Sequence, residues 1–205
     1  MSNVALILPT RGLIQSRTVE FLLGVPSLLC VPYFSHSRPI PDCFNEPIGR
    51  ALADGHDYIW ILEEDVVPPH DALETLLRPL AEDHADITFF DYGMANGTDV
   101  TARGVGGRFT LSGTGCLATT ARVMRALYPF DSRTAYRFPQ MTQLMRYSEQ
   151  QSREKVYGRH DIDFFVRVQT AGYRILEVGR AQHLKVKEYG KPGVNNGFHK
   201  IEVID

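Results

Sequence analysis

Short apolar strands that alternate with helical segments are the feature that most constrains this sequence. The runs at 4–9 (VALILP), 58–62 (YIWIL) and 86–92 (DITFFDY) are almost wholly apolar, as is typical of strands covered on both faces. Stretches with helical spacing lie between them, at 15–24 and from about 69 to 80. This alternation predicts an α/β fold with a mixed, mainly parallel sheet flanked by helices.

The segment 45–55 carries the signals of both ends of a helix. We expect Asn45 to cap it, Pro47 to lie in its first turn, and Gly55 to end it. Further expected elements are a strand at 27–34, helices at 119–128 and 161–172, strands at 173–178 and 182–187, and a loop-like tail over 187–205. Asp161 is expected to cap its helix.

Length and composition predict a single domain over residues 1–205, because 205 residues with 43% hydrophobic content can bury one sizeable core. The first residues lack the basic region of a signal peptide, and the longest uncharged apolar stretch, 21–34, is too short to span a bilayer. We therefore expect no membrane span. Cys30, Cys43 and Cys116 lack metal-type spacing, which suits buried thiols in a reducing cytoplasm.

Charge is divided unevenly along the chain. Residues 1–100 hold 5 basic and 15 acidic residues, whereas residues 101–205 hold 17 and 9. An acidic half joined to a basic half suggests a cation site in the first and an anionic ligand near the second. Two unrelated solvated surfaces would give the same distribution.

Three consecutive acids, Glu63, Glu64 and Asp65, directly follow the apolar run at 58–62. Ligands of open α/β sheets sit beyond the carboxyl ends of the strands. If the backbone stays extended, Glu63 and Asp65 point to one side and Glu64 to the other. Two converging carboxylates suit magnesium or manganese. The alternative is a solvated loop before a helix, because acids also favour helix N-termini.

Four stretches, in order, resemble the family 2-type glycosyltransferases of the GT-A fold, which use nucleotide sugars. They are LPTRG (8–12), GHDYIWILEEDVVPPHDALETLL (55–77), SGTGCLATTARVMRAL (112–127) and HDIDFFVRVQTAGYRILEVGRAQH (160–183). The resemblance implies a GT-A-like, Rossmann-related fold. It also implies transfer of a sugar from a nucleotide-diphosphate donor, with a UDP-sugar favoured, to an acceptor hydroxyl, with manganese or magnesium as cofactor.

The resemblance also assigns roles to the acids. Asp65 matches the second acid of the family's DXD motif, which binds the metal on the nucleotide diphosphate, and His183 matches a later metal-binding histidine. Glu63 takes the place of the motif's first acid, which is usually Asp in the family, and its role is a ribose contact, a water-mediated metal contact or neither. Asp161 matches the base of an inverting transfer, with Asp163 as the second candidate.

Two loops complete the expected site. By resemblance, Pro9, Thr10 and Arg11 contact the nucleotide together with Glu63, Glu64 and Asp65 in the donor half, 1–100. Gly113, Thr114 and Gly115 lie beside the acceptor in the catalytic half, 101–186. His160 takes the place of the family's usual Glu.

The acceptor is predicted from residues 122–159, where eight Arg or Lys stand against three acids and alternate with aromatic residues. Such a mixture suits an anionic acceptor, either DNA with a hydroxyl on a modified base or a phosphorylated lipid or glycan. The same charge could instead close over the donor phosphates. Two further hypotheses are a nucleotidyltransferase, which usually needs a more glycine-rich first loop, and a non-catalytic module that binds nucleic acid or sugar.

Overall fold

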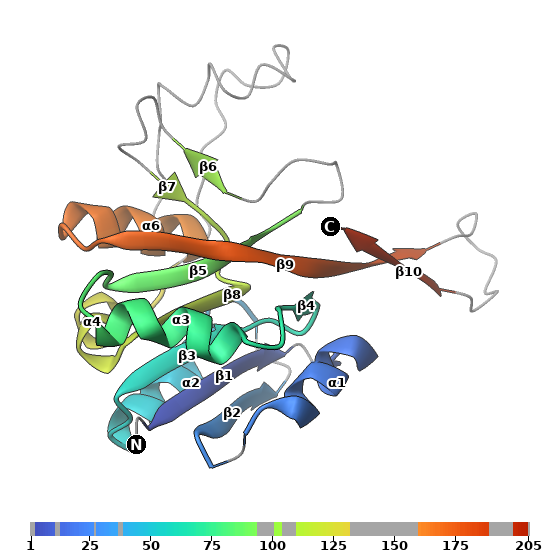
Figure 1. Cartoon of the computed structure of the whole chain (residues 1–205), viewed down its shortest axis with the longest axis horizontal. Helices are drawn as coiled ribbons and strands as arrows, with labels where there is room; N and C mark the ends of the chain where they lie inside the picture. Colours follow the sequence, from blue (N-terminus) through green and yellow to red (C-terminus); the bar gives the residue numbers. More distant parts are fainter. Residues whose placement is uncertain are drawn as a thin grey trace.

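The computed structural model of this chain describes residues 3–10, 13–26, 28–36, 39–93, 101–103, 110–131, 160–188 and 199–204. Its strands are β1 (Val4–Thr10), β2 (Cys30–His36), β3 (Tyr58–Leu62), β4 (Val66–Val67), β5 (Ile87–Tyr92), β6 (Ala102–Arg103), β7 (Thr110–Leu111), β8 (Cys116–Thr120), β9 (Ile175–Glu188) and β10 (His199–Ile204). Its helices are α1 (Ser16–Gly24), α2 (Asp42–Ala53), α3 (Ala72–Ala81), α4 (Ala121–Leu127) and α6 (His160–Thr170). Figure 1 shows helices on both faces of a twisted sheet.

The main sheet has the order β10-β9-β5-β8-β3-β1-β2, with β4 paired to β9 beside this path. β1 pairs in parallel with β2 and β3, and β5 with β9. β8 runs antiparallel between β3 and β5, and β9 pairs antiparallel with β4 and β10. The expected α/β class with a mixed sheet is confirmed. Parallel pairs do not dominate the described strands, because β8 returns beside β5 and β9 carries two antiparallel neighbours.

Two hydrophobic clusters, one on each face, explain the uninterrupted apolar strands. On β3, Ile59 and Ile61 pack into the cluster under α2, α4 and α6, whereas Trp60 and Leu62 pack into the cluster under α1 and α3. All four side chains are fully buried. Since successive strand residues face opposite sides, a strand covered on both faces must be apolar at every position.

Several expected element boundaries are corrected. α2 begins at Asp42, so Asn45 lies inside the helix and Pro47 lies beyond its first turn. The Asn45 side chain instead bonds the Phe130 backbone, donating to its carbonyl (2.9 Å) and accepting from its N–H (2.8 Å). Asp161 lies in the first turn of α6 and not at its cap, because this helix begins at His160.

The carboxyl-terminal part of the chain is more regular than expected. The two strands expected at 173–178 and 182–187 form one continuous strand, β9. The loop-like tail expected over 187–205 is wrong at 199–204, where β10 pairs with β9. Residues 189–198 lie outside the described part. β9 supplies the hydrogen-bond partner that makes the tail a strand, and a local pattern does not reveal that partner.

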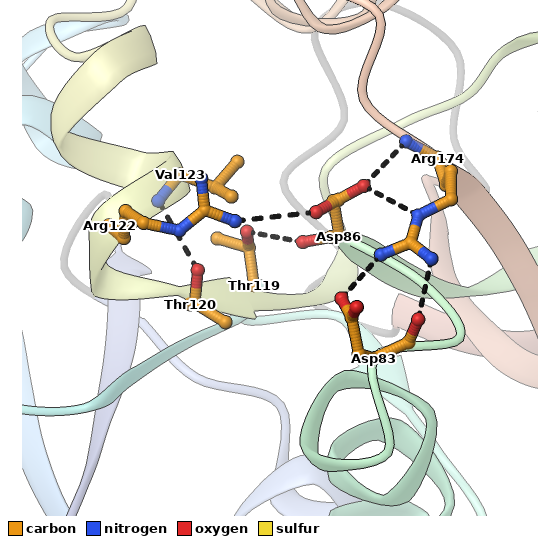
Figure 2. A network of polar contacts seen from close by, with 7 residues as sticks. All are labelled: Asp83, Asp86, Thr119, Thr120, Arg122, Val123 and Arg174. Carbon is orange, nitrogen blue, oxygen red and sulfur yellow. Dashed lines mark hydrogen bonds and ion pairs between the residues drawn. The ribbon is translucent and has the colours of Figure 1, made fainter.

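A polar network lies at the start of β5 and joins three segments of the chain (Figure 2). Arg174 donates to Asp86 Oδ2 (Nε, 3.0 Å) and to Asp83 Oδ1 (Nη2, 2.6 Å). Arg122 pairs with the other oxygen of Asp86 (3.5 Å), and Thr119 donates to the Asp86 carbonyl (2.8 Å). The network joins the β5, β8–α4 and β9 segments.

Two expectations about membranes and thiols can be checked on the described residues. Within these ranges, no helix combines the length and the apolar character needed to cross a membrane. Cys30, Cys43 and Cys116 are buried, free thiols.

Candidate active site

The acids that follow β3 lie in a turn. The Val66 N–H donates to the Glu63 carbonyl (3.3 Å), and the chain then enters β4, which pairs with β9. The Glu63 N–H is held by the Gly115 carbonyl (2.9 Å). The expectation of an extended backbone through these acids is therefore corrected: the turn, and not strand alternation, sets their directions.

Asp65 and His183 are brought together by the pairing of β4 with β9. Val66 is opposite His183, and the Leu184 N–H donates to the Asp65 carbonyl (2.7 Å). As a result His183 Nε2 lies 3.3 Å from Asp65 Oδ2. His183 is buried, with 4% of its surface exposed.

The other ring nitrogen of His183 determines what this pair can bind. Nδ1 lies 2.9 Å from the Gly93 carbonyl oxygen, which only accepts, so Nδ1 carries the hydrogen. In the neutral ring, the Nε2 lone pair then faces the Asp65 carboxylate. Two electron-rich groups repel each other, and a cation bound by both would stabilise this arrangement. A histidine that donates its second N–H to a backbone carbonyl is also the usual arrangement of a metal ligand.

Glu63 is held by Thr114. The Thr114 hydroxyl donates to Glu63 Oε1 (3.1 Å) and lies 3.2 Å from His160 Nε2, which can donate to it in turn. Burial raises the pKa of Glu63 to about 7, and the neighbouring Asp65 carboxylate is the next cause. Asp161 and Glu64 raise this pKa further, and the Thr114 hydrogen bond opposes them. Concentrated negative charge of this kind favours a bound cation.

Asp161 and Asp163 have different surroundings although both lie in the first turn of α6. The charge of Asp161 raises the pKa values of Glu63 and Tyr92, which places it with the acids. Asp163 is buried and accepts from Arg167 Nε (2.7 Å). Arg167 also donates to the carbonyls of Leu127 and Pro129, so Arg167, held by Asp163, fixes α6 against the end of α4.

Tyr92 is a site residue that the sequence interpretation missed. It ends β5, packs edge-on against His183 with ring centroids 4.8 Å apart, and is buried. Burial, followed by the charge of Glu63, raises the pKa of Tyr92 well above its ordinary value. A Cβ on Gly115 would lie 2.7 Å from its hydroxyl, so a side chain at residue 115 would force the Tyr92 ring or the backbone to shift. The only signal in the sequence was its position at the end of an apolar strand.

The described residues on either side of positions 11–12 can be placed relative to this turn. Pro9 and Thr10 end β1, where Thr10 N–H donates to Ser35 Oγ (3.2 Å). The Gln15 N–H donates to the Glu64 carbonyl (3.0 Å), which joins the segment after β1 to the acids. Arg11 lies outside the described residues. Gly113, Thr114 and Gly115 lie in a buried segment against Glu63 and Tyr92.

The candidate site offers a metal ion two protein ligands, Asp65 and His183, and not a complete coordination sphere. No group of three or more His, Cys, Asp or Glu side chains within the described ranges is arranged to hold a metal ion. Asp65 and His183 nevertheless supply an oxygen and a nitrogen on one side, with the ring oriented by Gly93. This donor set fits a divalent cation whose remaining ligands come from a bound molecule or water.

Comparisons with known proteins establish the fold. No protein-family model and no curated protein sequence matches this chain. Among solved structures, A197 from STIV has a TM-score of 0.59 at 14% identity, over 92% of this chain and 87% of that one. Glucosyl-3-phosphoglycerate synthase from Mycobacterium tuberculosis, in complex with Mg²⁺ and uridine diphosphate, has a TM-score of 0.51 at 15% identity, over 92% and 73%.

The same synthase in complex with Mn²⁺, uridine-diphosphate-glucose and phosphoglyceric acid has a TM-score of 0.50 at 13% identity, over 94% of this chain and 73% of that one. Likeness at such low identity concerns the fold alone. This chain therefore has a GT-A-like α/β fold.

Proposed function

We propose that this protein is a metal-dependent glycosyltransferase that moves a sugar from a nucleotide-diphosphate donor, with UDP as the favoured nucleotide, to an acceptor hydroxyl. The observation that carries the proposal is the His183 Nε2–Asp65 Oδ2 pair, 3.3 Å apart, beside Glu63 and Asp161 at the end of β3. The synthase that shares this fold is described in complex with UDP, UDP-glucose and Mn²⁺ or Mg²⁺.

Asp65 and His183 are the residues proposed to hold the divalent ion. Such an ion would stabilise negative charge on the departing nucleotide diphosphate. Glu63 is held by Thr114 and by the backbone of Gly115, which keeps its carboxylate beside Asp65. Glu63 would then contact the donor or the ion from a fixed position.

Asp161 is proposed as the general base of an inverting transfer. Its carboxylate accepts the proton of the acceptor hydroxyl as that oxygen attacks the anomeric carbon and the diphosphate departs. Asp163, the second candidate, is engaged with Arg167, and this ion pair supports a structural role for it. Pro9 and Thr10, with Arg11, remain proposed nucleotide contacts.

The acceptor is proposed to be anionic. The synthase with a similar fold is described in complex with phosphoglyceric acid, which supports a small phosphorylated acceptor here. Arg122 and Arg125 are the described members of the basic segment; Arg122 pairs with Asp86, and Arg125 donates to the Leu52 carbonyl. The other six basic residues lie outside the described ranges, so DNA with a hydroxyl-bearing base stays a prediction. A cytoplasmic location is also proposed, on the three buried free thiols.

Titration calorimetry with UDP in the presence and absence of Mn²⁺ tests the proposal. We expect Mn²⁺-dependent UDP binding by the wild type and its loss in Asp65→Ala. Glu74→Ala is the matched control, since this carboxylate is 77% exposed on α3. Unchanged binding in Asp65→Ala would contradict the metal role. Tighter binding of a nucleoside triphosphate than of UDP would favour a nucleotidyltransferase, and no metal-dependent binding would favour a non-catalytic module.

A further inference from the structure

A separate cavity of about 420 Å³ lies between α1, the segment after β4, and β9. Its lining residues are Arg17, Glu20, Phe21, Val67, Pro68, Pro69, His70, Arg180 and Gln182. None of them belongs to the candidate active site. Phe21 forms a buried part of the wall, held edge-on against Trp60 with centroids 6.1 Å apart. The cavity therefore has an apolar wall packed on the core and charged groups at its exposed side.

The cavity lies on the opposite face of the β4–β9 ribbon from the candidate active site. Val66 is paired with His183, and Val67 with Gln182. Side chains alternate along a strand, so Gln182 and Arg180 face the side opposite His183. Arg180 and Gln182 therefore line the cavity on one face of β9, whereas His183 lies on the other face.

Two arginines from distant parts of the sequence line this cavity. Arg17 belongs to α1 and Arg180 to β9, and Arg17 Nη2 donates to Gln182 Oε1 (2.8 Å), which holds α1 to the strand. His70 adds a third nitrogen-bearing group, and Glu20 is the one acid among the lining residues. The two arginines and the one glutamate give the lining a net charge of +1, which favours an anion.

The donors suit phosphate better than carboxylate. One guanidinium fork satisfies the two oxygens of a carboxylate, whereas phosphate offers further oxygens to a second guanidinium on another element. The apolar wall of Phe21, Val67 and Pro68 would cover the organic part of such a ligand. We propose that this cavity binds a small phosphate-bearing molecule between α1 and β9, independently of the nucleotide site.

Binding of inorganic phosphate to the whole protein tests this proposal. Arginine Nε–H signals of ¹⁵N-labelled protein are followed during a phosphate titration at constant ionic strength, with a chelator and without nucleotide. We expect Arg17→Gln and Arg180→Gln each to weaken phosphate binding roughly 10-fold. Glu20→Gln should strengthen it by about 3-fold, because it removes the opposing charge.

Three controls make the result decisive. Arg78→Gln removes an exposed α3 arginine that is not part of the lining, and should leave phosphate affinity unchanged. Asp65→Ala should also leave it unchanged, so the outcome does not depend on the proposed transfer. Phosphate affinity unaffected by Arg17→Gln and Arg180→Gln, in variants that melt like the wild type, would overturn the proposal. Acetate that binds as tightly as phosphate would overturn the choice of phosphate.

Discussion

At the scale of single residues, Asp161 and Asp163 differ in what surrounds them. The charge of Asp161 raises the pKa of the nearby Glu63, whereas Asp163 is paired with Arg167. We predict that Asp161→Asn leaves Mn²⁺-dependent UDP binding intact and lowers the transfer rate by roughly 100-fold or more, because the amide cannot accept a proton. Calorimetry measures the first quantity, and a transfer assay measures the second.

Asp163→Asn is the matched comparison. Removing its charge leaves Arg167 without its carboxylate partner, so we predict a lower free energy of unfolding, by about 1–3 kcal/mol. Urea unfolding measures that loss. A transfer rate near the wild-type value in Asp161→Asn would show that another group is the base.

Gly115 and Tyr92 provide a second test at the residue scale. An added Cβ at residue 115 would lie 2.7 Å from the Tyr92 hydroxyl, closer than real contacts allow. We predict that Gly115→Ala lowers the free energy of unfolding by about 1–3 kcal/mol through overpacking. The cost should be smaller when Gly115→Ala is made in a Tyr92→Leu background, because the ring has been removed. Equal costs in both backgrounds would contradict the proposed steric cause.

At the scale of elements, the Asn45 side chain bonds α2 to the segment after α4. Asn45 bonds both backbone groups of Phe130, and the Phe130 ring lies 6.1 Å from the His160 ring. We predict that Asn45→Ala lowers the free energy of unfolding by about 1–3 kcal/mol, because it leaves a partly buried N–H and C=O without partners. Asn45→Asp keeps the acceptor for the Phe130 N–H but places a carboxylate oxygen against the Phe130 carbonyl, so it should also unfold at lower urea than the wild type.

The pairing of β4 with β9 sets the position of Asp65 relative to His183. Asp65 and His183 are more than one hundred residues apart, and the register of β4 against β9 brings them within 3.3 Å. The candidate active site lies on one face of the β4–β9 ribbon, and the proposed phosphate cavity lies on the other. Both depend on this register. A shift of one residue would turn His183 to the cavity side and Gln182 to the acids.

At the scale of the whole molecule, the Asp86 network connects the two halves of the sequence (Figure 2). Burial alone would raise the pKa of Asp86, but hydrogen bonds and the charge of Arg174 outweigh it and hold this pKa below its ordinary value. Arg122 contributes in the same direction. A carboxyl whose folded-state pKa is lowered stabilises the protein above its unfolded-state pKa, and this contribution is lost as pH falls through the folded-state value.

We therefore predict that Asp86→Asn is less stable than the wild type at neutral pH and that the difference shrinks as pH falls from about 5 to about 2. Thermal unfolding across that range measures it. Glu74→Ala is the control, since its carboxylate is exposed and should show little such dependence. A difference that stays constant down to the lowest pH would contradict the role of the Asp86 charge.

The sequence by itself determined the order and type of most elements. Full coverage of β3 on both faces leaves no polar position, so its apolar run identified a buried strand directly. The acids after it, the Thr and Gly residues at 113–115 and Asp161 were likewise visible as residue types at strand and helix ends. Local pattern did not give the start of α2 at Asp42, and it did not reveal that β10 pairs with β9.

Only the tertiary structure decided which of these residues meet. The turn at Glu63–Val66 and the β4–β9 register place Asp65 against His183, and the close approach of Gly115 brings Tyr92 into the site. The fold also places Asp161 near Glu63, whereas Asp163 pairs with Arg167 four residues along the same helix, a contact that helical spacing alone allows. Contacts across strands depend on pairing register and on packing between distant elements, which no short window of sequence encodes.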